Sequence, residues 1–447
     1  MTNFKLADTE EKQSALRKIV SIAQSMGAEA SSVRGVFSKQ ITVNSRMRKI
    51  DYIEKSNEVK IAVDVYKNNK KGSVSLTSTS KKNIKRSIEK ALSLCKLTQA
   101  DECFGLPDAD MHSRASPLLE IYFPETPDIE TLKESVEECE DSALCFSPKI
   151  CNSEGASILS TEQEHVLANS SNFCGSYQST YHSISCCVLA KNDSNDALER
   201  DYWYDASRDF STLLSSSLIG EKSAQRTLAR LGARKIKSQK LPVLLPSYCA
   251  KSIVGSLVSS LSGTSQYQKR SFYQDCVGKQ IASDNIFIDE NPRQEKLIAT
   301  APFDSEGVET KNQPLITGGI VDRYLLSSYS ARRLGLKTTG NAGGARNLMV
   351  RANCSDINEL LIGFPEIFVV NEFLGQGVNE VTGDFSRGVS GFIMKKGEIA
   401  YPVNEITIAG NLKEIFHNIV ALGNDFDYRS SIISGSMIIE GLIISGS

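Results

Sequence analysis

The clearest helical pattern in the chain lies at residues 247–263, in "SYCAKSIVGSLVSSLSG". Apolar residues recur there three and four positions apart, which places them on one face of a helix that packs against a core. Ser247 is a suitable N-cap, and Gly263 is suited to end the helix. We therefore predict an amphipathic, structural helix whose apolar stripe comprises Ala250, Ile253, Val254, Leu257, Val258 and Leu261.

Alternation of apolar and polar residues is typical of strands instead. Residues 59–65 alternate in this way and turn at 68–72 into a second strand, which predicts a hairpin between two helices. Residues 150–214 form short alternating stretches, and from residue 241 strands and glycine turns dominate, with one further helix at most near residues 407–423. The predicted class is α+β, in which N-terminal α/β units precede a C-terminal domain dominated by antiparallel β-sheet.

At 447 residues, the chain is long enough for two or three domains. Changes in the hydrophobic pattern indicate where the domain boundaries lie. We expect an α-β-β-α domain at 1–105, a proline-bearing linker at 106–127, a helix with antiparallel strands at 128–235, and a C-terminal domain at 236–447.

Composition and charge exclude several functions. A net charge of −2 argues against a nucleic-acid surface, which needs a clustered excess of basic residues. The N-terminus lacks an apolar signal region, and no apolar run approaches the ~20 residues that cross a membrane. Eleven cysteines without a CxxC pair indicate reduced thiols. We therefore expect a cytoplasmic protein with no membrane or nucleic-acid partner.

Several long motifs in the second half resemble one known family. They are "APFDSEGVET" at 301–310, "YLLSSYSARRLGLKTTGNAGG" at 324–344, "GDFSRGVSGFIMKKGEIAYPVNEITIAGNL" at 383–412, and "GND" at 423–425. Their order and length resemble the TldD/PmbA family, on its PmbA (TldE) side, and the resemblance covers nearly the whole chain.

The resemblance implies a subunit of a heteromeric TldD–TldE zinc metalloprotease that cleaves small or unfolded peptides, such as antitoxins and the leaders of peptide antibiotics. In the family, an HExxxH helix and a cysteine near the C-terminus hold zinc, and the glutamate acts as the base. A TldD-like partner would then supply the zinc. The alternative is a stand-alone peptide-binding or regulatory protein, and a gyrase or nucleic-acid regulator ranks third.

This chain departs from the family at each position of the zinc site. The helix at 247–263 places Gly255 and Ser260 where the two histidines would stand, and Ser256 where the glutamate would stand. Ser434 takes the place of the cysteine. Glycine offers no ligand, and a neutral hydroxyl is a poor zinc donor. The four histidines show no metal-ligand spacing, and His165 is expected to follow a turn. We expect no zinc and no catalytic residue in this chain.

Two further loops carry polar side chains that could line a cleft or a partner interface. Asp304 and Glu306 could belong to a carboxylate site, or to a tight turn in which Gly307 has a positive φ and Asp304 accepts backbone hydrogen bonds. Asp384 and Arg387 lie in a predicted glycine turn, where they could pair with each other or face the partner. A serine nucleophile is disfavoured because the chain has no GxSxG motif.

A subunit without zinc ligands could still serve proteolysis. It could shield the partner's cleft from water and offer a sheet edge to an extended peptide. The expected partners are thus a TldD-like catalytic subunit and peptide substrates, with a homodimer as the form when the chain is alone.

Overall fold

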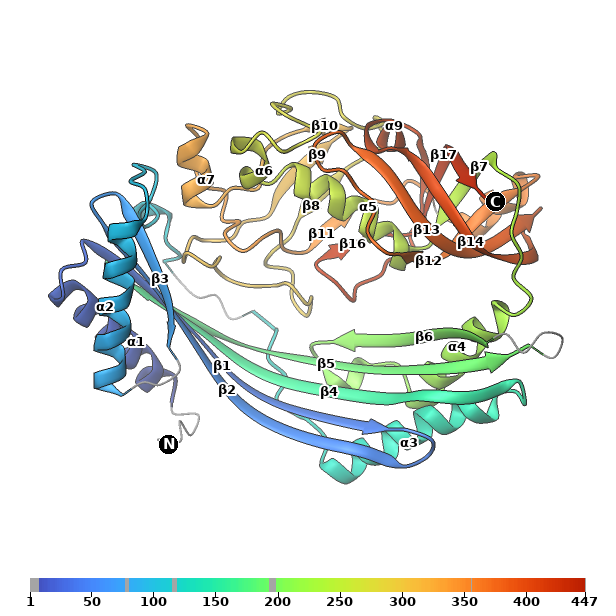
Figure 1. Ribbon diagram of the computed structural model, residues 1–447, viewed down its shortest axis with the longest axis horizontal. Helices are drawn as coiled ribbons and strands as arrows, with labels where there is room; N and C mark the ends of the chain where they lie inside the picture. The colour runs from blue at the N-terminus through green and yellow to red at the C-terminus, as the bar shows by residue number, and fades with distance from the viewer. Residues whose placement is uncertain (1–7, 77–79, 115–118, 193–197, 355, 447) are drawn as a thin grey trace.

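The computed structural model describes residues 8–76, 80–114, 119–192, 198–354 and 356–446. These ranges form a long, curved sheet with four helices and a C-terminal body that contains two further sheets (Figure 1). The predicted α+β class is confirmed. None of the helices in the described ranges combines the length and apolar character that crossing a bilayer requires.

The long sheet has six strands, all antiparallel. They are β1 (Ala30–Ser45), β2 (Ile50–Lys67), β3 (Lys70–Leu76), β4 (Ile150–Asn169), β5 (Cys174–Lys191) and β6 (Leu198–Ser207). Their spatial order is β3-β2-β1-β4-β5-β6. Because β1 pairs with both β2 and β4, the segments predicted as the first and second domains contribute to one continuous sheet. The predicted α-β-β-α order omitted β1, so the observed order is α-β-β-β-α.

Four helices cover one face of this sheet. They are α1 (Thr9–Ser25), α2 (Lys81–Leu97), α3 (Ile129–Cys145) and α4 (Ser216–Ala229). Along β1, Val33 and Phe37 pack in the core with α1 and α2, and Val43 packs in the core with α3 and α4. Since side chains alternate along a strand, Arg34 and Val36 point to the opposite face. That face turns toward the C-terminal body (Figure 1).

A closed ring of strands forms the larger sheet of the C-terminal body. Its strands are β7 (Gln239–Leu245), β12 (Ile367–Leu374), β13 (Asp384–Lys395), β14 (Glu398–Asn411), β15 (Ile419–Leu422) and β17 (Met437–Ser445). The order is β14-β13-β12-β7-β17-β15, and a further pairing of β14 with β17 closes the ring. A hairpin turn at 395–398 joins β13 to β14, because Lys395 pairs with Glu398.

A smaller sheet and short helices complete this body. The sheet comprises β8 (Ile288–Glu290), β9 (Gln313–Thr317), β10 (Ile320–Val321), β11 (Leu348–Val350) and β16 (Ile432–Ile433). Single turns η1 (Ala109–Met111) and η2 (Phe210–Thr212) lie in the connections between elements of the first half.

The predicted helix at 247–263 exists as α5 (Ser247–Ser260), with Leu257 fully buried. It ends three residues early, and Pro246 rather than Ser247 is its N-cap. The prediction of one further helix at most was wrong, because α6 (Gly263–Tyr267), α7 (Ser328–Arg333), α8 (Ile357–Gly363) and α9 (Leu412–His417) follow. The helix expected near 407–423 is confined to α9, since residues 419–422 pair with β17 instead.

Candidate functional site

The polar side of α5 carries a stripe of small residues. Ser252, Gly255, Ser256 and Ser259 recur at helical spacing, and all four are half-buried. Ser259 Oγ donates to Glu380 Oε1 at 3.1 Å, which ties this side of the helix to the segment before β13. A Cβ built on Gly255 would lie 3.7 Å from its nearest neighbour, which is ordinary van der Waals contact.

The segment of Ser434 runs beside the same part of α5. Ile432, on β16, supplies the atom that lies 3.7 Å from the Cβ position of Gly255. Ser434 follows two residues later, is fully buried, and donates its hydroxyl to Gly435 O at 2.9 Å. The helix and the Ser434 segment, which the sequence places in one site, are therefore neighbours in space.

The residues in this site do not fit a zinc ion. Ser256 Oγ donates to Ser252 O at 3.3 Å, and Ser260 Oγ donates to Leu257 O at 2.6 Å. These hydroxyls, like that of Ser434, hydrogen bond to backbone carbonyls of their own helix or loop. Zinc in proteins is held by imidazole, thiolate or carboxylate groups. Within the described residues, no three His, Cys, Asp or Glu side chains gather closely enough to hold a metal ion.

Arg387 contacts α5 from β13. Its Nη1 donates to Ser252 Oγ at 2.7 Å, its Nη2 donates to Gly375 O at 2.9 Å, and its guanidinium stacks 4.3 Å from the ring centre of Phe373. Of the two alternatives for this pair, mutual pairing is not the one observed, because Asp384 accepts from Thr382 Oγ1 at 2.6 Å instead. The predicted glycine turn was wrong, since both residues lie within β13, where positions three apart point to opposite faces.

Asp304 and Glu306 lie in a different place, against the long sheet. Asp304 is 2% exposed and accepts from the backbone N–H groups of Glu306, Val308 and Ala342 at 2.8–3.0 Å. Gly307 has φ +86°, so the predicted tight turn is confirmed. Burial, reinforced by the charge of Glu306, raises the pKa of Asp304 to about 7 despite these donors. The carboxylate joins its own turn to the loop of Ala342.

A groove separates this turn from the helix-free face of the long sheet. One part, of about 870 Å³, has on its lining Arg34, Val36 and Phe303. A second part, of about 460 Å³, shares His165, Tyr177 and Arg346 with the first. His165 lies inside β4, not after a turn as predicted, and its ring stacks on Tyr177 with centroids 4.7 Å apart. Burial, with Arg208 and Arg346 nearby, lowers the pKa of His165 to about 4.

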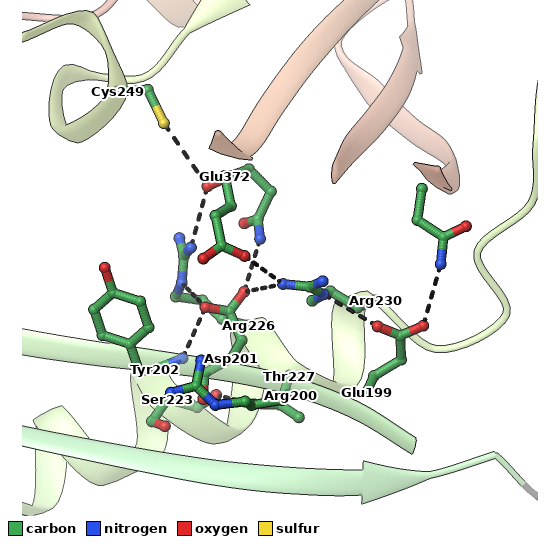
Figure 2. A network of polar contacts seen from close by, with 12 residues as sticks. Glu199, Arg200, Asp201, Tyr202, Ser223, Arg226, Thr227, Arg230, Cys249 and Glu372 are labelled. Carbon is green, nitrogen blue, oxygen red and sulfur yellow. Dashed lines mark hydrogen bonds and ion pairs between the residues drawn. The ribbon is translucent and has the colours of Figure 1, made fainter. Parts of the chain in front are cut away.

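A buried polar network connects the long sheet to the C-terminal body (Figure 2). Asp201, on β6, is 1% exposed and accepts from Asn371 Nδ2, on β12, at 2.7 Å. Arg226 Nε, on α4, donates to the same carboxylate at 3.3 Å. Arg230 Nη1 lies 3.7 Å from Asp201 and 3.0 Å from Glu372, also on β12. Charged groups from both bodies thus meet in one network, which fixes the distance between the two bodies.

The sequence matches models of all three domains of one family. They are the PmbA/TldA metallopeptidase domain 1 at residues 32–95, the central domain at 122–231, and the C-terminal domain at 238–446. A curated relative, the metalloprotease PmbA of Escherichia coli O157:H7, is 38% identical over 99% of this chain and 98% of its own. The chain belongs to the PmbA/TldD metallopeptidase family.

Other family members extend this similarity. The metalloprotease PmbA homolog of Haemophilus influenzae is 37% identical over 98% of this chain and 97% of its own. A Bacteroides thetaiotaomicron protein described as a modulator of DNA gyrase superposes with a TM-score of 0.92 at 26% identity, over 98% of this chain and all of that one. TldE from Thermococcus kodakarensis, with a TM-score of 0.84 and 17% identity over 97% of this chain and all of its own, shares the fold.

The sequence did not reveal the groove or the polar network. Arg346 lies in the glycine-rich "GNAGGARN" stretch, which has no strand-GxGxxG-helix context that would indicate a binding loop. Arg208 follows β6 without any motif. A usable signal existed on β4 and β5, where the strand period of two places the polar residues Thr161, Gln163 and Ser179 on the face opposite the helices. Thr161 and Ser179 are nonetheless buried, because the C-terminal body covers that polar face.

Proposed function

We propose that this chain is the non-catalytic, TldE-type subunit of a heteromeric TldD–TldE zinc protease that acts on small or unfolded peptides in the cytoplasm. A TldD-like partner holds the zinc and performs the hydrolysis. This chain contributes binding surface and excludes water from the joint cleft. The observation that carries the proposal is the occupation of the family's zinc-site positions by Gly255, Ser256, Ser260 and Ser434 in an otherwise complete family fold.

Two features support a role at the partner's cleft. The polar stripe of α5 remains half-exposed, although its hydroxyls offer no ligand set. Arg387 holds β13 against that stripe through Ser252, so the strand and the helix form one firm surface. An arginine fork of this kind can hold both a loop carbonyl and a group across an interface.

Co-expression with the TldD-like protein of the same organism tests the proposal. We expect the two chains to copurify, zinc to be found with the partner, and an unfolded peptide to be cleaved only by the mixture. Metal content by elemental analysis and cleavage by mass spectrometry are measured for each chain alone and for both together. About one zinc in the isolated chain, or full cleavage by the partner alone, would overturn the assignment.

A second candidate function, a stand-alone peptide-binding protein, is favoured by the groove between the long sheet and the C-terminal body. The larger part of that groove, about 870 Å³, lies within the range of pockets that hold small ligands. Deletion of the TldD-like gene distinguishes the two candidate functions. Only a stand-alone protein would retain its biological effect in the deletion strain.

A further inference from the structure

The smaller part of the groove, here called the arginine pocket, has an unusual charge balance. It measures about 460 Å³ and lies between β4 and β5 of the long sheet and residues 298–301 of the C-terminal body. Its lining contains two arginines and a histidine but no aspartate or glutamate among the described residues. The polar lining residues are Gln40, Thr161, Gln163, His165, Tyr177, Ser179, Tyr181, Arg208, Thr300 and Arg346.

Both arginines lack a carboxylate partner in the described part of the chain. Arg208 is 8% exposed and is held by backbone carbonyls, with Nη1 donating to Thr180 O at 2.7 Å and Nη2 donating to Ile298 O. Burial lowers the pKa of Arg208 to about 10, which leaves it charged at neutral pH. The guanidinium of Arg346 has no hydrogen-bond or ion-pair partner within the described ranges, and its Nε is buried. The charge of Arg208 is buried without a counter-ion, and half-buried Arg346 has an unsatisfied Nε, so an anion would be favoured here.

The larger part of the groove continues from the arginine pocket and differs in character. Tyr177 packs edge-on against Phe303 at 5.3 Å, and both side chains stand at the junction with His165. Val36, Leu167 and other apolar residues line the rest of the larger part of the groove. Apart from the shared Arg346, the cations there are already paired. Arg34 lies 3.6 Å from Asp64, and Lys60 lies 2.6 Å from Glu58. A ligand that fits both parts has an apolar or neutral body and one terminal anion.

We propose that the arginine pocket binds the free C-terminal carboxylate of an extended peptide whose preceding residues lie in the larger part of the groove. This inference rests on the proposed peptide substrate class and assigns this chain the recognition of the peptide end. Arg346 supplies the unpaired fork that matches a carboxylate in bidentate geometry, and Arg208 adds a fixed positive charge. Gln163, Thr161 and Ser179 offer hydrogen bonds to the last peptide units.

The test measures peptide binding by the isolated full-length chain. Two pools of acetylated nonapeptides of random sequence are prepared, identical except that one ends in a free carboxylate and the other in a carboxamide. Equilibrium dialysis with mass-spectrometric counting gives the bound ratio of the two pools. We expect the free acids to be favoured about tenfold or more, because hydrogen bonds to charged groups are the stronger class. Equal binding of the two pools overturns the proposal.

Two variants locate the effect in the arginine pocket. Arg346→Gln removes the unpaired charge, and Gln163→Glu places a carboxylate of nearly the same shape in the pocket. Each should bring the ratio of acid to amide close to one without changing the thermal unfolding temperature by more than a few degrees. The matched control is Arg351→Gln, because Arg351 is 58% exposed, pairs with Asp289 and lies outside the pocket. A preserved ratio in both pocket variants contradicts the inference.

This result is separable from that of the proposed function. If the chain copurifies with its partner and supports cleavage but shows no preference for free acids, only the carboxylate site fails. If it prefers free acids through Arg346 but never associates with a TldD-like chain, the heteromer fails and the peptide site stands.

Discussion

Asp201 lies at the centre of the polar network that joins the two bodies. It accepts from Asn371 and Arg226 and faces Arg230, and its carboxylate is 1% exposed. Replacing it with alanine would leave an amide and two guanidinium groups in a poorly hydrated place. We therefore predict that Asp201→Ala loosens the C-terminal body from the long sheet before either body unfolds.

The structure allows a rough magnitude for this change. Removing one partner of a buried ion pair costs about 3–5 kcal/mol, largely because the other charge stays buried. Two contacts moderate the loss here. Arg226 keeps the hydroxyl of Tyr248 at 2.9 Å, and Arg230 keeps Glu372 at 3.0 Å. The lower end, about 3 kcal/mol, is the expected loss of stability. It affects the junction between the bodies because Asn371 loses its partner and Arg230, which contacts Glu372 of β12, loses one of its carboxylates there.

The single tryptophan offers a direct assay. Trp203 lies beside the network, with the guanidinium of Arg226 5.0 Å from its ring centre, so its emission follows the junction between the bodies. In urea, the emission change of Asp201→Ala should come at a lower concentration than the loss of far-ultraviolet circular dichroism. Glu154→Ala is the control, because its pair with Arg200 is about half exposed on both sides and is worth under about 1 kcal/mol. The reasoning would be refuted if, in Asp201→Ala, the emission change and the loss of circular dichroism coincided at the urea concentration of the wild-type transition.

Four further substitutions test the remaining assignments. Leu257→Ala, in a fully buried position, should lower the free energy of unfolding by about 2–5 kcal/mol in a denaturant titration, whereas Ser256→Ala should change neither stability nor cleavage by the heteromer. A large loss of cleavage in folded Ser256→Ala would revive a serine nucleophile. Arg387→Ala should stay folded but weaken cleavage or subunit affinity, and wild-type values for both would contradict its role. Because the folded chain keeps a proton on Asp304 that the unfolded chain releases, the wild type should lose stability relative to Asp304→Asn as the pH rises from 3.8 to about 7. Parallel stability curves would contradict that pKa.

Local patterns were the part of the fold that the sequence could predict. The stripe of α5, the hairpin that joins β2 to β3 and the turn at Gly307 each depend on residues within a few positions of one another. β1 escaped because it is buried among β2, β4 and the helices in an irregular pattern, although its pairing with β2, the next strand along the chain, is local. Its continuity with β4, which joins the first two segments, is a long-range pairing that no local pattern reports.

The same limit explains the errors at the candidate site. Proximity in sequence suggested a pair between Asp384 and Arg387, but a strand sends residues three apart to opposite faces. Arg387 instead reaches Ser252, which is 135 positions away in the chain. Arg208 and Arg346 come together with His165 only because the long sheet curves beneath the C-terminal body (Figure 1).

The polar network and the groove are linked through this arrangement. Strands β4 and β5 form one wall of the arginine pocket, and the C-terminal body forms the other, so the distance between the bodies determines its width. Asp201→Ala should then weaken the preference for free-acid peptides although it touches no residue of the pocket. Arg346→Gln should remove that preference while leaving the urea transitions of the wild type intact. If only Asp201→Ala shifts the urea transitions while both variants reduce the preference for free acids, attachment of the bodies and recognition of the ligand are separate properties. The reason is that Asp201→Ala alters the spacing of the pocket walls, whereas Arg346→Gln alters only their charge.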